Sequence, residues 1–309
     1  MRLLSRVADN MLWLNRYVER ASCLVRVLRN SYILSFDLGL SKSKSFDAAN
    51  DIFYSGFLSE DTEIGTLLNT FITDNYNPNS VRVLLGKARE NARASQDKIS
   101  KEVWEQLNSL YHYINSPAVI EQLKNGEAMK VLDYLHNQFF LYYGVLDTTM
   151  ARGEAWEFLN TGKYIERSIL TIDITEWYLK DLNYDLNEGN VVYWRPMLLA
   201  LTGYEQYLKG IKHTPHTPQI IDFVLFNKYF NHSLIYSVTR LHRYSKNIIL
   251  QNSSVQGQSV VKQVERLKSN IEFYDNSKLC GETVTELLNN ARKQIWNYYD
   301  DFYKLILGY

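Results

Sequence analysis

Charged side chains recur at helical spacing near the N-terminus of this chain, and their mixture of arginine with carboxylates suits two kinds of chemistry. Guanidinium groups bind phosphate or carboxylate through paired N–H donors, whereas neighbouring acidic groups neutralise them in an ion-pair network. Steps of three, four, three and four residues place five side chains along one side of a helix. These five are Arg6, Asp9, Trp13, Arg16 and Arg20.

A short motif that occurs twice adds to this stripe. Residues 15–21 read NRYVERA and residues 162–168 read GKYIERS, so tyrosine, a branched aliphatic residue, glutamate and arginine follow a cation in both. If these side chains are buried, each arginine needs a carboxylate, because desolvating a lone charge costs several kcal/mol. The simplest arrangement sets the two helices face to face, so that each glutamate meets the arginine of the other helix.

A third charged segment, LLGKARENARASQDKI, contributes two arginines one helical turn apart with a glutamate beside them. It is a candidate third wall of the same polar centre. The candidate polar-centre or anion-binding residues are Arg6, Asp9, Trp13, Arg16, Glu19, Arg20, Arg89, Glu90, Arg93, Lys163, Glu166 and Arg167. Two interpretations stay open: a structural ion-pair network that fixes helix register, or an anion site, since seven cations stand against four carboxylates.

The elements that position these residues are predicted to be long helices. The chain has only 14 glycines and 5 prolines among 309 residues, too few for the turns of many short strands. Between Leu3 and Phe36 neither occurs, and apolar residues recur every three or four positions. We expect a single all-α domain over residues 1–309. It would contain about ten to twelve helices, with two long helices carrying the repeated motif as a pseudo-repeat.

The boundaries of the other helices follow from apolar periodicity, capping residues and prolines. The candidate caps are Asn79 or Ser80 for one helix and Ser100 for the next, and Pro117 is a candidate first helical residue. The expected helices are 46–57, 64–72, 80–98, 100–114, one from Pro117, 127–150, 153–182, 196–211, one from Pro218, 233–251, 259–274 and 282–306. No segment shows the alternation typical of a strand.

Several classes of protein are not expected. Basic and acidic residues balance at 34 each with no basic block, so nucleic acid is not an expected partner. No run of about 18 apolar residues could span a membrane, and the charged N-terminus is unlike a signal peptide. The two cysteines, Cys23 and Cys280, lie far apart and outside any zinc-binding spacing. We expect a cytoplasmic protein without a metal.

The sequence also lacks the common motifs of cofactor chemistry. Neither GxxxxGK[ST] nor GxGxxG occurs, so no phosphate-binding loop and no cofactor are expected. The pair Asp133 and His136 is a single Asp-x-x-His, best explained as a helix-surface pair. No catalytic residue is assigned, and the sequence favours a protein without enzymatic activity. The aromatic clusters QFFLYYG (138–144) and WNYYDDFY (296–303) either fill the core or form an interface.

Four separated blocks resemble the bacterial alpha-E family, a helical domain named for a Glu-Arg motif. They are LLSRVADNMLWLNRYVERA (3–21), ARENARASQDKISKEVWEQLN (88–108), WEFLNTGKYIERS (156–168) and YWRPMLLALTGYEQY (193–207). The motif maps to Glu19 with Arg20 and to Glu166 with Arg167. The family pattern has a proline near Asn231, which this chain lacks.

The resemblance implies partner proteins for this chain and no known reaction. Alpha-E domains look like partners of circularly permuted ATP-grasp-type ligases and transglutaminase-like peptidases, in systems that form or process a peptide or amide bond. The chain would then be a non-catalytic accessory or adaptor protein. The alternative is an enzyme or binding protein whose polar centre takes a phosphorylated or carboxylated small molecule or peptide.

Overall fold

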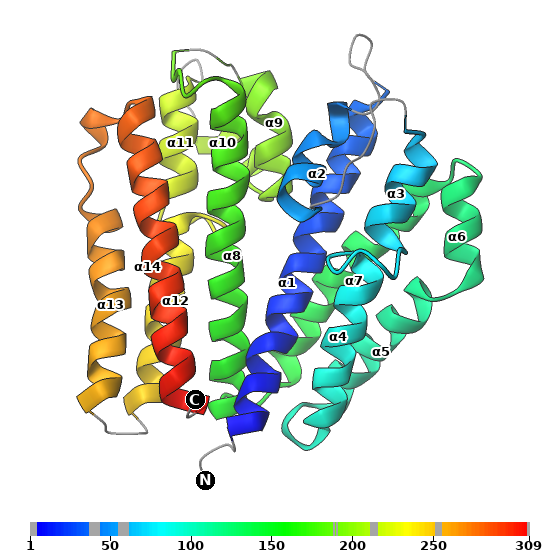
Figure 1. Cartoon of the computed structure of the whole chain (residues 1–309), viewed down its shortest axis with the longest axis horizontal. Coiled ribbons are helices and arrows are strands. Elements are labelled where there is room, and N and C mark those ends of the chain that lie inside the picture. The colour runs from blue at the N-terminus through cyan, green and yellow to red at the C-terminus, as the bar shows by residue number, and fades with distance from the viewer. Residues whose placement is uncertain are drawn as a thin grey trace. The chain divides into compact units, whose positions relative to one another are not determined.

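The computed structural model describes residues 5–36, 44–54, 62–187, 189, 191–210, 216–250 and 255–307. These residues form fourteen α-helices and three short 3-10 helices, and no strand occurs among them (Figure 1). The prediction of an all-helical fold is therefore confirmed, with more helices than the ten to twelve expected. None of the described helices is long and apolar enough to cross a membrane.

The helices divide into two compact units. The first unit is Trp13–Trp156, and the second unit is Met1–Leu12 together with Glu157–Tyr309. The boundaries fall inside the two long helices that carry the repeated motif, α1 (Ser5–Leu34) and α8 (Glu154–Asp181). That the chain acts as one domain stays a prediction, and each unit is described by itself below.

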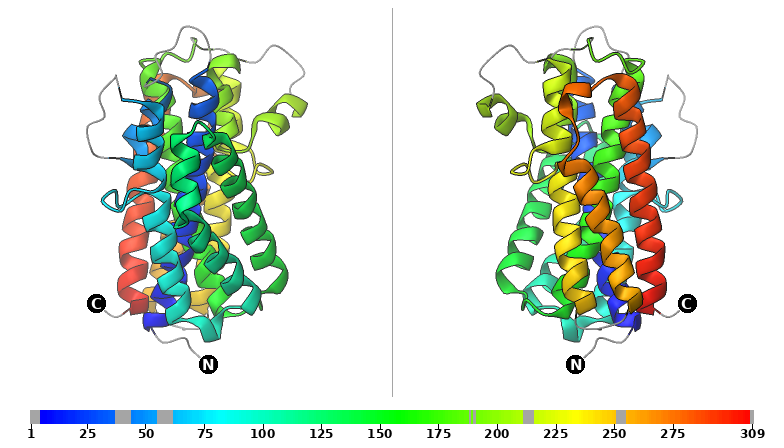
Figure 2. Two further views of the ribbon diagram at one scale, coloured as in Figure 1. Left: turned by 90° about the vertical axis from the view of Figure 1, so that its right-hand side faces the viewer. Right: turned by 90° about the vertical axis from the view of Figure 1, so that its left-hand side faces the viewer.

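In the first unit, α4 packs against α5 and α5 packs against α7 (Figure 2). Besides α1 and two 3-10 helices, this unit contains α2 (Asp47–Phe53), α3 (Ile64–Ile72), α4 (Val81–Ala94), α5 (Lys101–Ile114), α6 (Pro117–Lys124) and α7 (Ala128–Thr149). Ser80 and Ser100 cap α4 and α5, as the sequence predicts, because each hydroxyl accepts a hydrogen bond from the amide three residues later at 3.2 and 3.3 Å.

The second unit repeats this order of packing. After α8 it contains α9 (Val191–Ala200), α10 (Tyr204–Gly210), α11 (Thr217–Phe226), α12 (Leu234–Leu250), α13 (Val255–Glu272) and α14 (Gly281–Leu307). Helix α12 packs against α13 and α13 against α14, as the yellow, orange and red ribbons of Figure 2 show. Thus α8, α12, α13 and α14 correspond in chain order to α1, α4, α5 and α7.

The single helix expected over 196–211 is wrong, because the chain breaks it into α9 and α10. Thr202 adopts a left-handed backbone with φ of 59°, and the amide of Gly203 donates to the Leu198 carbonyl at 2.7 Å. This is the geometry that ends a helix. A β-carbon at Gly203 would press on the rings of Phe230 and Phe223, so the break also lets the chain approach these aromatic residues closely.

The two aromatic clusters contribute to the core through one face each. Phe139 and Tyr142 are fully buried on α7, while Phe140 on the opposite side is half exposed. Tyr298 and Phe302 are likewise buried on α14. The spacing of three and four residues between the buried members is that of an amphipathic helix, so their main role is packing.

Candidate functional site

The glutamate of the first motif is buried and bonded within its own unit. Only 1% of Glu19 is exposed, and its carboxylate accepts a hydrogen bond from the Tyr143 hydroxyl at 2.5 Å. One turn earlier, Asn15 accepts from the Tyr142 hydroxyl at 2.7 Å. Two successive tyrosines of α7 therefore bond to two successive turns of α1, and Glu19 acts as an acceptor that fixes the register of these helices.

The arginine of the first motif bonds to the loop that leads into α4. Arg20 donates to the side-chain oxygen of Asn79 at 3.1 Å. Asn79 directly precedes Ser80, the residue that caps α4. On the adjoining turn, the Arg16 guanidinium lies 4.1 Å from the centre of the Trp13 ring, a favourable cation–π distance. These contacts join Arg16 and Arg20 to other side chains of the first unit.

The second motif bonds to the corresponding loop of its own unit. Glu166 and Arg167 are 1% and 6% exposed, and Arg167 donates to the backbone carbonyl of Asn231 at 3.3 Å. One turn later, Thr171 donates to the carbonyl of His232 at 3.0 Å. Position 232 directly precedes Ser233, which caps α12 by accepting from the Tyr236 amide at 3.1 Å. Each arginine of the repeated motif therefore bonds to the residues just before a serine cap.

The two loops share a hydrogen-bond pattern, and we call them the serine-capped loops 74–80 and 227–233. In the first, the Asp74 side chain accepts from the amide two residues later, and Ser80 donates to the Asp74 carbonyl at 2.6 Å. In the second, the Asn227 side chain accepts from the amide two residues later, and Ser233 donates to the Asn227 carbonyl at 2.6 Å. The side-chain turn at the start and the cap at the end make both loops rigid.

Each serine-capped loop presents one tyrosine to solvent at the same position. Tyr76 is 96% exposed and Tyr229 is 87% exposed, and each follows the first loop residue by two positions. An aromatic ring on a hydrogen-bonded loop loses little conformational freedom when it binds, since its backbone is already fixed. These two tyrosines are the exposed features that the buried motif supports.

The tyrosine of each motif lies near a cation of the serine-capped helix. The Lys87 ammonium lies 5.6 Å from the centre of the Tyr17 ring, and Lys87 follows Ser80 by seven residues. Arg240 follows Ser233 by the same interval, and its charge interacts with the Tyr164 and Tyr236 hydroxyls. The Tyr164 ring also stacks on Tyr244 at 5.8 Å. The repeat thus extends to the side chains between the paired helices.

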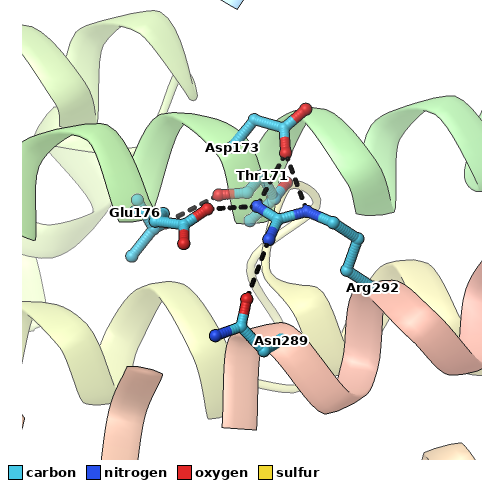
Figure 3. A network of polar contacts seen from close by, with 6 residues as sticks. Thr171, Asp173, Glu176, Asn289 and Arg292 are labelled. Carbon is cyan, nitrogen blue, oxygen red and sulfur yellow. Dashed lines mark hydrogen bonds and ion pairs between the residues drawn. The ribbon is translucent and has the colours of Figure 1, made fainter. Parts of the chain in front are cut away.

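Each long helix also forms an ion pair with the last helix of its unit, with the charges exchanged. In the first unit Arg29 of α1 pairs with Asp133 of α7 at 2.7 Å. In the second unit Arg292 of α14 pairs with Asp173 of α8 at 2.9 Å and also with Glu176 (Figure 3). Arg29 and Glu176 lie ten residues beyond the glutamates of their motifs, so they occupy equivalent positions.

The network around Arg292 contains more acid than base. Burial raises the pKa of Asp173, and the hydrogen bond and charge of Arg292 only partly oppose this effect. Glu176 and Glu166 add negative charge that raises the pKa further. Arg292 therefore stabilises the carboxylates of α8, and its own pKa is raised by the two acidic partners despite burial.

The remaining candidate residues make contacts of several kinds. Arg6 is exposed. Burial raises the pKa of Asp9, and a hydrogen bond from Tyr303 partly opposes this shift. The Lys163 ammonium lies 5.5 Å from the Tyr164 ring. Arg89 bonds to Asn108 and Glu90, and Arg93 pairs with Glu90. These partners of Arg89, Glu90 and Arg93 belong to α4 and α5, whereas Lys87 of the same segment lies near Tyr17 of α1.

The arrangement of both motifs around one polar centre stays a prediction. Arg6, Asp9, Lys163, Glu166 and Arg167 belong to the second unit, whereas the other candidates belong to the first. Sequence reasoning missed Tyr143, the serine-capped loops and the Arg292 network. The loops carried a usable signal, because DNYNPNSV (74–81) and NKYFNHSL (227–234) share an Asp or Asn, a tyrosine and a serine at equal spacing.

Taken together, these features define an all-helical protein in which the arginine of each Glu-Arg pair bonds to a serine-capped loop, with Glu19, Glu166 and Arg167 buried. A family model described as a predicted alpha-helical domain with a conserved ER motif, Alpha-E, matches residues 3–304. The chain therefore belongs to the Alpha-E family. No curated protein and no solved structure matches it.

Proposed function

We propose that this chain is a non-catalytic helical accessory protein that binds a circularly permuted ATP-grasp-type ligase and a transglutaminase-like protein in a peptide- or amide-forming system. The observation that carries this proposal is the exposed tyrosine on each serine-capped loop. Tyr76 and Tyr229 occupy equivalent positions in their loops, and each loop accepts a hydrogen bond from the arginine of one motif. Tyrosine is enriched at protein interfaces because it combines a large apolar ring with a hydroxyl.

The contacts of the motif support a structural role for its charged groups. Glu19, Glu166 and Arg167 are each at least nine-tenths buried, and the bonds described above for Glu19 and Arg167 run to a neighbouring helix and a loop. A buried carboxylate or guanidinium that already bonds to its own fold stabilises helix register rather than meeting a substrate. The charged motif would then act on a partner indirectly, through the loops that it holds in place.

The experiment is affinity purification of the tagged chain from its native host under mild conditions, followed by mass spectrometry. We expect an ATP-grasp-type protein at near-equal amount with the unaltered chain and its loss with the double variant Tyr76→Ser, Tyr229→Ser. Phe36→Ser removes another exposed aromatic ring, 67% exposed, and is the matched control that should keep the partner. Recovery of the chain alone would contradict the accessory role. Recovery of the ligase with both variants would contradict the role of the tyrosines.

A further inference from the structure

A cleft opens between the end of α13 and the first half of α14, in the second unit. Its volume is about 750 Å³, enough to hold several side chains of a bound molecule. The apolar part of its lining includes Leu267, Ile271 and Leu287. None of the described residues that line this cleft belongs to the Glu-Arg motifs or to the serine-capped loops.

The rim of the cleft carries an unusual exposed aromatic residue. Phe273 lines the cleft and is 81% exposed, although burying a phenylalanine side chain stabilises a protein by about 1.5–3 kcal/mol. Next to it, the Tyr274 ring stacks on Phe226 with centres 5.3 Å apart and planes at 11°. Stacking therefore holds the Tyr274 ring in place in the lining of the cleft, while the exposed Phe273 ring is accessible to an apolar group of a ligand.

The charge of the cleft is acidic. Asp275 and Glu286 line it, and no lysine or arginine occurs among the described lining residues. Two nearby lysines, Lys228 and Lys268, both pair with Glu272, at 2.7 and 3.4 Å, outside the lining. These two lysines are thus engaged outside the cleft, and a complementary ligand would bring positive charge of its own.

The polar lining suits a peptide main chain. Asn270, Asn290 and Gln294 line the cleft, and each carboxamide can both donate to a carbonyl and accept from an amide. Ser269 adds a hydroxyl group with the same two capacities, whereas the Thr283 hydroxyl is already bonded to the backbone of Cys280. A bound segment could therefore satisfy its backbone groups while its side chains meet the apolar walls and the carboxylates.

We infer that this cleft binds a peptide segment in which a lysine or arginine stands one or two positions from a leucine or an aromatic residue. The apolar side chain packs on Leu287 and Phe273, and the cation meets Glu286 and Asp275. A cation close to Phe273 gains further from the ring face. The inference does not depend on the accessory role proposed above, because it rests on different residues.

The test starts with selection of random dodecapeptides displayed on phage against the immobilised full-length chain, with removal of phages that bind the uncoated support. Selected sequences are then synthesised with a fluorescent label, and their affinity is measured by fluorescence anisotropy. We expect basic peptides with apolar residues. Their affinity should fall about tenfold in Glu286→Lys, equivalent to about 1.4 kcal/mol, and should weaken as salt rises.

Matched variants separate the cleft from general charge and stickiness. Phe273→Ser should weaken binding, while Phe140→Ser, which removes a half-exposed ring of the first unit, should not. Glu265→Lys reverses an exposed charge on α13 outside the lining and should also leave affinity unchanged. Glu286 and Phe273 are exposed, so their substitution should leave the thermal melt in place.

The inference would be overturned by selection of acidic or uncharged peptides, by equal affinity for the unaltered chain and Glu286→Lys, or by a selection that yields no binding peptide. A simple polyamine such as spermine that matches the peptide in affinity would also overturn it, because the apolar walls and carboxamides would then contribute nothing.

Discussion

Gly162 of α8 packs so closely on the carbonyl of Leu12 in α1 that a β-carbon at position 162 would overlap the carbonyl oxygen. Both residues belong to the second unit. Gly162 is also the first residue of the second motif, GKYIERS. Glycine usually weakens a helix interior, so its presence here reflects the close approach of two helix backbones rather than a turn.

Gly162→Ala should therefore destabilise the protein by about 3 kcal/mol or more, because backbone cannot move aside as a flexible side chain can. Gly144→Ala is the matched control: it lies exposed in α7, and a β-carbon there has no neighbour within 4 Å. This control should raise stability by up to about 1 kcal/mol through helix propensity. Urea unfolding followed by circular dichroism measures both, and equal effects would contradict the close approach.

The buried guanidinium of Arg167 distinguishes the structural interpretation from the anion site. Arg167→Met should lower stability by about 2–4 kcal/mol, because the Asn231 carbonyl and the other partners of this charge lose a charged donor. Arg243→Met removes an exposed arginine of α12 and should change the melting temperature little. An unchanged melt for Arg167→Met, together with lost partner binding, would favour a binding site instead.

Because these ion pairs have their charges exchanged between the two units, we expect that reversing both charges of a pair restores most of the stability lost when only one charge is reversed. Asp133→Arg should destabilise the first unit, since Arg29 then faces a like charge. The double variant Arg29→Glu, Asp133→Arg should recover most of the loss, with a coupling energy of about 0.5–1.5 kcal/mol, modest because both side chains are partly exposed. A double-mutant cycle in urea measures this coupling. Simple additivity would show that the pair contributes nothing.

Long-range structure explains which features were predictable from the sequence. The long helices α1 and α8 follow from unbroken apolar periodicity, and the caps at Ser80 and Ser100 follow from local hydrogen bonding, so both were predicted. The pairing of Arg292 with Asp173 joins residues more than a hundred positions apart, and only packing brings them together. The break at Thr202 was missed because the signal is a tertiary contact of Gly203 with aromatic rings.

The residues of the candidate site were predictable from the sequence, but their bonding partners were not. Composition and spacing identified the Glu-Arg pairs but left their burial open, and the structure buries Glu19, Glu166 and Arg167. What spacing could not provide was the partner of each group. The Tyr143 hydroxyl is a neutral donor, and the Asn231 carbonyl is a backbone atom, so a search for opposite charges could find neither.

His136 of α7 gives the first unit a pH dependence of known sign. The pKa of this imidazole is lowered to about 4, mainly by burial and also by the charges of Arg26 and Arg29, against a smaller opposing effect of Asp133. The unfolded chain, with the ordinary pKa of about 6.5, therefore binds more protons than the folded chain between these two values. The contribution of His136 to stability is present above pH 6.5 and is lost as the pH falls towards 4.

Replacement of His136 by glutamine removes this titration. We expect the unfolding free energy of the unaltered chain to fall by about 1–2 kcal/mol more than that of His136→Gln between pH 7 and pH 4.5, after allowance for solvent screening of a half-buried group. Urea unfolding at a series of pH values measures the difference, and an NMR titration of the imidazole protons reports the pKa directly. A titration midpoint near 6.5 in the folded protein, with parallel stability curves, would contradict the burial of this side chain against the two arginines.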